Sequence, residues 1–440
     1  MRIYFFDVFC SLLHSVAAEY CNNGNFVEAS YLLSKHAELT ELNDDSLPQI
    51  EYGFREMMKI PEELSWKRRI YLLEKAINLC EEACAWERCL VLIDVLIRDI
   101  RSLEWHRDLL KKYLQKQIEL LDRLSYSTRL PSSFFMVSYH GGGFHEEFRN
   151  SVVVFHRPRG ETITEFISIQ QKKHPDVVFL KQNQNPDELS LDCDKYIKIV
   201  KVKQDNTFSL NRKNLNFSNS NEIDFKFQEI GSKLQSTDDS TNVFEYKICS
   251  RRNASISNEF LDLWVTKYFI VTDVALPSHV DKTNVVRVTA ILLNPIEVAL
   301  EEVGDRLSIL GRGIKEMEKI SNQENKFASQ QTTMELSGTI DAAVNGGISK
   351  YYSFISYDYK WENPAIDIDI VESGKDINTI LMKFKVAFQQ LIDVAGKAVE
   401  MHKIKVSGEM KSLHDHLEGL YVNNIVPKNK EFMHDGINNV

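Results

Sequence analysis

The spacing of the apolar residues changes twice along this chain of 440 residues, and no other feature constrains its fold as strongly. Up to residue 128, and again from residue 293, apolar residues recur every three or four positions, as in amphipathic helices. From 129 to 292 they form short β-branched and aromatic runs separated by Gly, Asn, Asp and Pro, as in strands. The sequence therefore predicts an α+β protein of three lobes.

The first lobe, 1–128, is predicted to be an armadillo-like array of helices, although no regular repeat period is present. Residues 2–18 loosely resemble a secretion signal, but Asp7 and His14 interrupt the apolar stretch, which favours an amphipathic helix. Arrays of this kind commonly act as scaffolds or dimer surfaces. The predicted helices cover 5–20, 26–40, 69–82, 86–100 and 108–124.

The second lobe, 129–292, is predicted to be a mainly antiparallel sheet, because little helical sequence separates most of its apolar runs. Two segments rich in Asn, Ser, Asp and Lys, 204–222 and 232–242, are expected to be long loops. The predicted strands cover 134–139, 151–156, 176–181, 196–203, 243–249, 260–272 and 284–293.

The third lobe, 293–425, is predicted to be a helical bundle. Asn294 and Pro295 form a helix start signal, a capping residue followed by proline in the first turn. Apolar residues then follow with alternating spacings of four and three from Ile296 to Met317, and a second such seam runs through 377–395. Residues 426–440 are expected to form a flexible tail.

Composition excludes several classes of function. The formal net charge of −10 argues against nucleic acid as a partner, because phosphate binding requires a basic surface. No uninterrupted apolar run of about 18 residues occurs, so no membrane insertion is expected. Seven cysteines form no disulfide framework and indicate a reducing, cytoplasmic compartment.

Motifs for covalent chemistry or metal binding are incomplete. The glycine-rich segment 140–143 resembles the oxyanion loop of some esterases, but no G-x-S-x-G nucleophile motif accompanies it, so a connection between strands is favoured. No phosphate-binding G-x-x-x-x-G-K-[ST] loop occurs. The cysteines at 80, 84 and 89 are interpreted as core residues, and the histidines at 414 and 416 point to different helix faces. We therefore predict no metal site and no cofactor.

One segment, 336–351 (LSGTIDAAVNGGISKY), is difficult to explain as plain helix. Gly338, Asn345, Gly346 and Gly347 each disfavour a continued helix, and a small apolar stretch lies between them. A helix interrupted by a glycine-flanked apolar loop indicates a backbone shaped for close approach to a partner, whereas the alternative is a plain turn between helices.

This segment resembles the signature of the second, catalytic homology region of the Dock family of guanine-nucleotide exchange factors. Further resemblances follow in order over about 10–420, among them Asn25–Ala29, His36–Leu39, Phe135–Val137, Tyr139–Gly141, Phe148–Asn150, Asn185–Pro186, Cys193, Tyr196, Asn294–Ile296, Ala299, Leu413–His414 and Leu417. The resemblance implies a helical lobe that forms a homodimer. It also implies a sheet lobe and a bundle that together bind a Rho-family GTPase.

The resemblance also implies a mechanism. The family's nucleotide sensor is a valine that matches Val344, which would place an apolar group where the GTPase holds Mg²⁺. Asn345, Gly346 and Gly347 would let the loop approach closely. The factor would act against Mg²⁺ and GDP on its partner, with no cofactor of its own and no covalent chemistry, and thus not as an enzyme in the ordinary sense.

Residues around the sensor are expected to contact the GTPase, namely Met334, Ile340, Ala343 and Tyr351. Ten positions before the sensor, Rac-directed members tend to carry methionine and Cdc-type exchangers leucine. Met334 stands there, which favours a Rac-like partner. Ala342 departs from the family, where proline is often found.

A role in cytoskeletal signalling would follow from the family. The chain is expected to be a catalytic fragment or an unusually short member, with membrane recruitment supplied by regions outside it. The alternative function is a non-catalytic scaffold that binds a GTPase or a partner helix.

Overall fold

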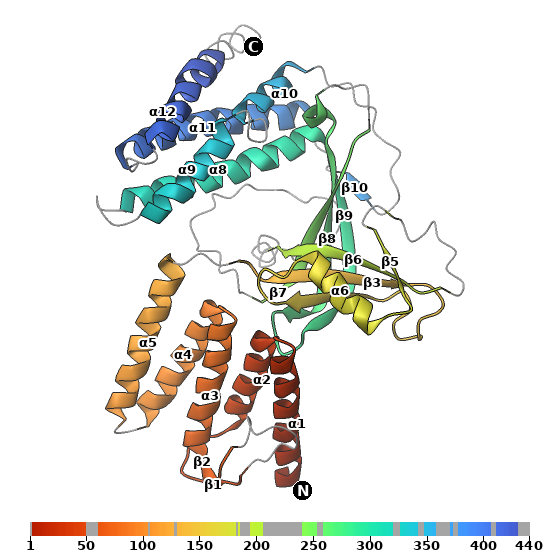
Figure 1. The fold of residues 1–440 in the computed structure, drawn as a ribbon, viewed down its shortest axis with the longest axis vertical. Coiled ribbons are helices and arrows are strands. Elements are labelled where there is room, and N and C mark those ends of the chain that lie inside the picture. Colours follow the sequence, from red (N-terminus) through yellow and green to blue (C-terminus); the bar gives the residue numbers. More distant parts are fainter. Residues whose placement is uncertain are drawn as a thin grey trace. The chain divides into compact units, whose positions relative to one another are not determined.

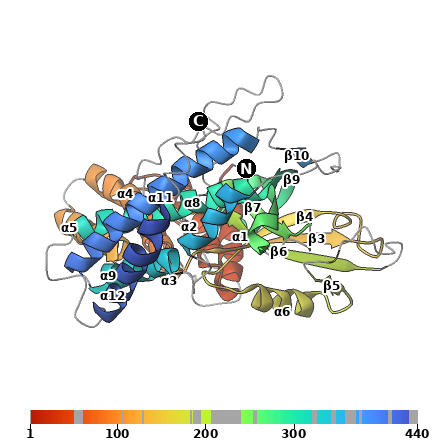
Figure 2. The same cartoon turned by 90° about the horizontal axis from the view of Figure 1, so that it is seen from above.

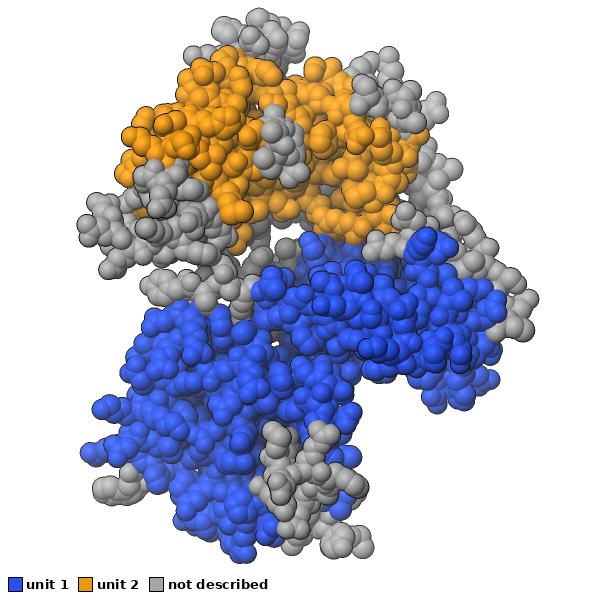
Figure 3. Space-filling view, viewed as in Figure 1, with its two compact units in different colours: residues 1–224, 232–246, 269–288 blue, residues 225–231, 247–268, 289–440 orange. Residues whose placement is uncertain are grey.

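The computed structural model describes the chain in two compact units (Figure 3). Unit 1 comprises 1–224, 232–246 and 269–288, and unit 2 comprises 225–231, 247–268 and 289–440. Within these bounds, the residues whose structure is described are 2–49, 60–103, 106–126, 130–181, 184, 194–205, 240–252, 258–319, 326–341, 347–357, 370–372, 377–405 and 411–429.

The N-terminal part of unit 1 is an array of helices, each packed against the next in chain order (Figure 1). All five predicted helices are present, and a short antiparallel pair, β1 (Ser46–Leu47) with β2 (Glu63–Leu64), lies between the second and third. The helices are α1 (Arg2–Asn22), α2 (Phe26–Leu39), α3 (Ser65–Glu82), α4 (Trp86–Ser102) and α5 (Arg107–Tyr126).

In this array, the apolar residues that recur at helical spacing are the ones that are buried. On α4, Cys89, Leu92, Leu96 and Ile100 recur at spacings of three and four and are all buried. The thiol of Cys80 lies 2.9 Å from the Ser30 hydroxyl inside the same core. The interpretation of Cys80 and Cys89 as core residues is confirmed, and Cys84 is half-buried beside the same core.

The sheet of the second predicted lobe is mainly antiparallel and closes on itself. Its strands pair in the order β9-β4-β3-β6-β7-β8, and β8 also pairs with β9, so six strands form a ring. β5 and β10 add to this ring by parallel pairing, β5 to β6 and β10 to β9. The strands are β3 (Ser133–His140), β4 (Val152–Arg157), β5 (Val178–Leu180), β6 (Tyr196–Gln204), β7 (Thr241–Ser250), β8 (Trp264–Leu276), β9 (Lys282–Leu293) and β10 (Ile370–Glu372).

Alternation along β3 builds a core on each face of the sheet. Phe135 and Val137 pack with Phe166 on one face, and Phe134 and Met136 belong to a second core on the opposite face. Since successive side chains of a strand point to opposite faces, a strand buried on both faces reads as a continuous apolar run.

A helix covering the first of these faces was not predicted. α6 (Ile163–Lys173) follows β4 and lies beside β5 and β6 (Figure 2). Its start is a capping box, in which the Thr162 hydroxyl accepts from the backbone N–H of Glu165 and the Glu165 carboxylate accepts from that of Thr162. The signal was present in the sequence, because Ile163, Phe166 and Ile167 follow helical spacing, and all three pack in the core on this face.

The predicted strand 260–272 begins too early. Residues Glu259–Asp262 form a short 3-10 helix, and β8 starts only at Trp264. The Asn258 side chain accepts a hydrogen bond from the backbone N–H of Phe260, which stabilises a turn instead of an extended start. Of the two expected loops, 204–222 and 232–242, only the ends lie among the described residues, and Thr241 already belongs to β7.

Side chains join the helical array to the sheet within unit 1. Glu28 of α2 and His156 of β4, both buried, form a hydrogen-bonded pair. Arg157 donates to the Asn25 side chain at 3.3 Å, and Arg159 donates to the backbone carbonyl of Ala83 at 3.2 Å. The helical array and the strands β3 to β6 therefore belong to one compact unit.

Unit 2 contains the helical bundle. α8 and α11 pack along each other, and α9 and α12 pack against α11 (Figure 2). Apolar residues of both predicted seams form the core, including Ile296, Val303, Phe384 and Phe388. The bundle elements are α8 (Pro295–Lys319), α9 (Lys326–Ile340), the 3-10 helix η5 (Ile348–Tyr351), α10 (Tyr352–Ser356), α11 (Ile377–Lys405), α12 (Lys411–Leu420) and the π-helical turn η7 (Tyr421–Ile425).

The predicted start of the bundle is confirmed at Asn294. Its side-chain oxygen accepts from the backbone N–H of Glu297 at 2.9 Å, and the Glu297 carboxylate accepts from the backbone N–H of Asn294 at 3.0 Å. At the other end, residues 426–429 of the predicted tail are still helical. Among the described residues, the helices that are long enough to cross a membrane are not sufficiently apolar to do so.

Candidate functional site

The segment singled out in the sequence lies where a bundle helix is interrupted. α9 ends at Ile340, the chain is described as far as Asp341, and it is described again from Gly347, which precedes η5. The predictions for Ala343, Val344, Asn345 and Gly346 fall outside the described residues. The two flanks can therefore be examined, and they define how the interruption is anchored.

Gly347 occupies a position that requires glycine. Its φ of +52° lies in the region that side chains disfavour. A Cβ on Gly347 would lie 2.9 Å from the backbone carbonyl carbon and oxygen of Asp341 and 2.9 Å from the carbonyl oxygen of Ile340. The backbone at the end of α9 and the backbone before η5 are thus in direct contact.

η5 is held by the bundle core. Ile348 and Tyr351 are fully buried, and the Tyr351 ring packs edge-on against the rings of Phe384 and Phe388 of α11. Burial, and then the neighbouring charge of Glu302, raises the pKa of Tyr351. The Tyr351 side chain lies in the core, where it anchors η5, and the expected contact of this residue with a GTPase stays a prediction.

The two remaining predicted contacts differ in exposure. Ile340 is buried in the same core as Tyr351. Met334 of α9 is 74% exposed, which is unusual for a long apolar side chain. Of the described predicted contacts, Met334 alone is available to a partner as the structure stands, and its role in recognition stays a prediction.

Charged residues near both flanks were missed by sequence reasoning. Glu302 and Arg306, one turn apart on α8, connect to Gly338 in α9 and to Lys350 in η5. Glutamate and arginine at this spacing usually lie on a solvent-exposed helix face, so their pattern in the sequence did not indicate a link to the interrupted helix. The position of Lys350 inside the signature was the one available signal.

A histidine cluster joins the C-terminal helices of the bundle. His402 of α11 lies 2.6 Å from the Thr333 hydroxyl of α9 and 2.9 Å, Nδ1 to Nδ1, from His414 of α12. Burial, and then His414, lowers the pKa of His402 to about 4, which keeps the His402 ring neutral within this hydrogen-bonded array. The array links three helices, including the one that leads to the interruption.

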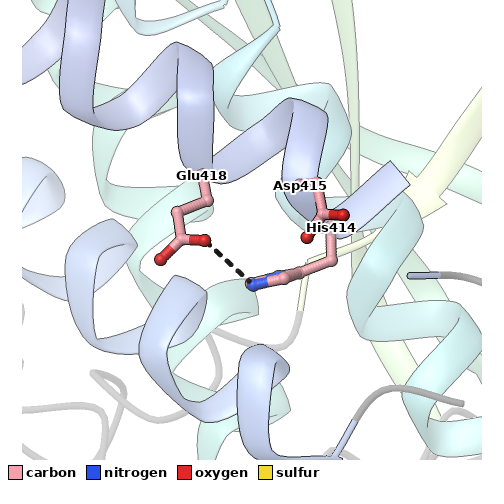
Figure 4. A group of neighbouring side chains, drawn as sticks. All are labelled: His414, Asp415 and Glu418. Atoms are coloured by element: carbon pink, nitrogen blue, oxygen red, sulfur yellow. Dashed lines mark ion pairs between the residues drawn. The ribbon is translucent and has the colours of Figure 1, made fainter. Parts of the chain in front are cut away.

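His414, Asp415 and Glu418 lie close enough to be considered as metal ligands (Figure 4). The Nε2 atom of His414 faces Glu418 at 3.6 Å. Glu418 already accepts from Lys403 at 2.8 Å, and this ammonium opposes a second cation on the same carboxylate. His416 turns away from this group and lies 3.5 Å from Asp341, at the end of α9.

The glycine-rich segment 140–143 connects β3 to β4, as expected. Gly141 has φ +105°, and a Cβ there would lie 1.9 Å from the carbonyl oxygen of Asp194. Close approach of two backbone segments explains this glycine.

No protein-family model matches the chain. Among curated proteins, it is 24% identical to dedicator of cytokinesis protein 3 of Mus musculus over 423 residues, which are 93% of this chain and 19% of that protein. It is 24% identical to dedicator of cytokinesis protein 4 of Homo sapiens over 421 residues, again 93% and 19% of the two chains. It is 23% identical to DOCK-like protein 1 of Saccharomyces cerevisiae over 432 residues, 95% and 20% of the two chains.

These matches confirm the resemblance to the Dock family. They extend along nearly the whole chain, through both compact units. The chain spans about a fifth of the length of the curated relatives it matches.

Proposed function

We propose that this chain is a guanine-nucleotide exchange factor for a Rho-family GTPase. The observation that carries the proposal is the similarity to Dock-family proteins over 93% of the chain. The anchored interruption of the bundle supports it, because a sensor segment must be presented by a rigid base. Here that base is η5, fixed by Ile348 and Tyr351 in the core.

The proposed mechanism is competition with Mg²⁺ and GDP on the GTPase. Mg²⁺ requires near-octahedral oxygen ligands. The isopropyl group of Val344 supplies none and excludes water, so the diphosphate loses its counter-charge. Binding of the factor and binding of Mg·GDP then oppose each other with the same coupling in both directions. Asn345, Gly346 and Gly347 let the backbone approach, and no bond is made or broken by the chain.

Release of a fluorescent GDP analogue from a panel of Rho-family GTPases tests this function. We expect the chain to accelerate release from a Rac-like member and Val344→Ala to reduce the acceleration about tenfold or more, because a smaller apolar group no longer fills the metal site. Acceleration that is unchanged in Val344→Ala would retain the function but reject the sensor. Binding without acceleration on every GTPase would favour the alternative, a non-catalytic scaffold.

The preference for a Rac-like partner is proposed to depend on Met334. Because this side chain is exposed, Met334→Leu should leave the free energy of unfolding within about 0.5 kcal/mol of the wild type. It should shift the ratio of exchange rates from Rac-like towards Cdc-type GTPases by a few-fold. Equal rates on both GTPases for wild type and variant would contradict the assignment.

Homodimerisation through the helical array α1–α5, a cytoplasmic location and a role in cytoskeletal signalling are further parts of the proposal. Light scattering coupled to gel filtration tests the first of these. A monomer at all concentrations would remove the dimer and leave the exchange activity unaffected.

A further inference from the structure

A single carboxylate on α8 is bonded to two basic side chains that reach opposite flanks of the interrupted helix. The Glu302 Oε1 atom accepts from Lys350 Nζ at 2.6 Å and from Arg306 Nη2 at 3.3 Å. Arg306 Nη1 in turn donates to the backbone carbonyl of Gly338 in α9 at 2.6 Å. Glu302 therefore connects η5, through the Lys350 side chain, to the C-terminal part of α9, through Arg306 and the backbone carbonyl of Gly338.

The burial of Lys350 makes this connection strong. Its side chain is only 6% exposed, and its ammonium lies 4.7 Å from the ring centre of Phe260 and 5.1 Å from that of Tyr351. A buried ammonium requires a counter-charge, and Glu302 supplies it. If the carboxylate is neutralised, Lys350 must move towards water, and η5 must move with it.

Because the backbone at Gly347 contacts the backbone at Asp341, a movement of η5 would also affect the end of α9. The two flanks touch at that point, so a small displacement of η5 changes the geometry of both. Ion pairs on a helix surface usually contribute little to stability. An ion pair that links two flanks of an interrupted helix can instead fix their relative position, which is a geometric role.

We propose that Glu302 is a positioning residue, which holds Lys350 of η5 and, through Arg306, Gly338 of α9 in the fixed relation that nucleotide exchange requires. Its part in exchange rests on the proposed function, whereas the positioning itself does not. Glu302 would act on the rate of GDP release from the bound GTPase, with little effect on GTPase binding.

Glu301, the preceding residue, provides a matched control. It too accepts from two ammonium groups, Lys247 at 3.0 Å and Lys267 at 2.8 Å, and its exposure, 34%, is close to the 38% of Glu302. Its partners lie on β7 and β8 rather than at the interruption. A general effect of removing a carboxylate from α8 would therefore appear in both Glu301→Gln and Glu302→Gln. An effect on the position of η5 would appear only in Glu302→Gln.

The test compares wild type, Glu302→Gln and Glu301→Gln as the full chain, first by amide hydrogen exchange of the free protein. We expect residues 347–352 to exchange about tenfold faster in Glu302→Gln alone. Titration of a Rac-like GTPase then separates kcat from KM for GDP release. In Glu302→Gln, we expect kcat to fall about tenfold and KM to stay within about twofold of the wild-type value. In Glu301→Gln, we expect kcat and KM to be unchanged.

Lys350→Met keeps the aliphatic stem and removes the ammonium. We expect it to reproduce the Glu302→Gln effect, and the double variant to add nothing further, because both changes break the same bond. Thermal unfolding identifies any variant that fails to fold, and Lys350→Met then serves as the second means of breaking the bond.

Unchanged protection of 347–352 in Glu302→Gln would overturn the proposal, as would equal effects in Glu301→Gln or a change in KM alone. A wild type without exchange activity on any GTPase would reject the proposed function and, with it, the role in exchange. Faster hydrogen exchange confined to Glu302→Gln and Lys350→Met would still establish the connection, so the two failures are distinguishable.

Discussion

At the scale of single residues, Gly347 shows how one position controls the interrupted helix. Gly347→Ala adds a Cβ that must move away from the carbonyl group of Asp341, and it places alanine at a positive φ. We expect a loss of about 1–3 kcal/mol in the free energy of unfolding of unit 2, and a fall in GDP release if the proposed function holds. Chemical denaturation measures the first effect.

The control for this prediction is Gly311→Ala on α8, where a Cβ meets no atom within 4 Å. Alanine is preferred to glycine in a helix by about 1 kcal/mol, so Gly311→Ala should be neutral or stabilising. Equal stability of the two variants would show that the backbone contact at Gly347 is not maintained in solution.

At the scale of secondary-structure elements, caps decide where helices begin. Asn294→Ala removes the oxygen that accepts from the N–H of Glu297, and we expect a loss of about 1 kcal/mol in the free energy of unfolding. Asn294→Asp retains an acceptor and should cost much less. If both variants unfolded at the same denaturant concentration as the wild type, the cap at the start of α8 would contribute nothing to stability.

The elements also show where sequence reasoning succeeds and fails. The helices of the array and the seams of the bundle were predicted because their apolar period is long and regular. α6 was missed because the helix has only 11 residues, so its apolar spacing, Ile163, Phe166 and Ile167, extends over little more than one turn. The start of β8 was predicted too early because the Asn258 side chain accepts a hydrogen bond from the backbone N–H of Phe260 and favours a turn there. The spacing of apolar residues does not indicate such a bond.

At the scale of the whole molecule, buried histidines make both units sensitive to acid. Burial, assisted by neighbouring charge, lowers the pKa of His14 to about 4 and that of His36 to about 3 in unit 1, and that of His402 to about 4 in unit 2. His14 Nε2 and His36 Nδ1 lie 2.6 Å apart, and one of these two nitrogens must accept, so the two rings cannot both be fully protonated while the bond persists.

The sign of the pH dependence follows from these lowered values. Above about pH 6.5 the histidines are neutral in both the folded and the unfolded chain, and stability is unaffected. Below it, the unfolded chain binds protons that the folded chain does not, so each group costs at most about 1.4 kcal/mol per pH unit until pH approaches its folded pKa. We expect the denaturation midpoint to be constant from pH 8 to 7 and to fall from pH 6.5 to 5.

Most carboxylates remain ionised in this range, so the histidines dominate the change. His402→Gln removes one of these histidines from unit 2. We expect the denaturation midpoint of unit 2 to fall less on acidification than in the wild type, and that of unit 1 to fall as before. A midpoint that does not move between pH 7 and 5 would contradict the prediction for both units.

The sequence by itself determined the order of helical and strand regions, the start of the bundle at Asn294 and the end of a helix within the segment 336–351. Those features depend on local periodicity, capping and backbone preference, which are determined by residues close together in the sequence. Only the tertiary structure decided that the sheet closes into a ring, that Tyr351 lies in the core and that Glu302 joins Lys350 to Arg306. Those features depend on contacts between residues far apart in the chain, because burial and charge pairing are set by what the fold brings together.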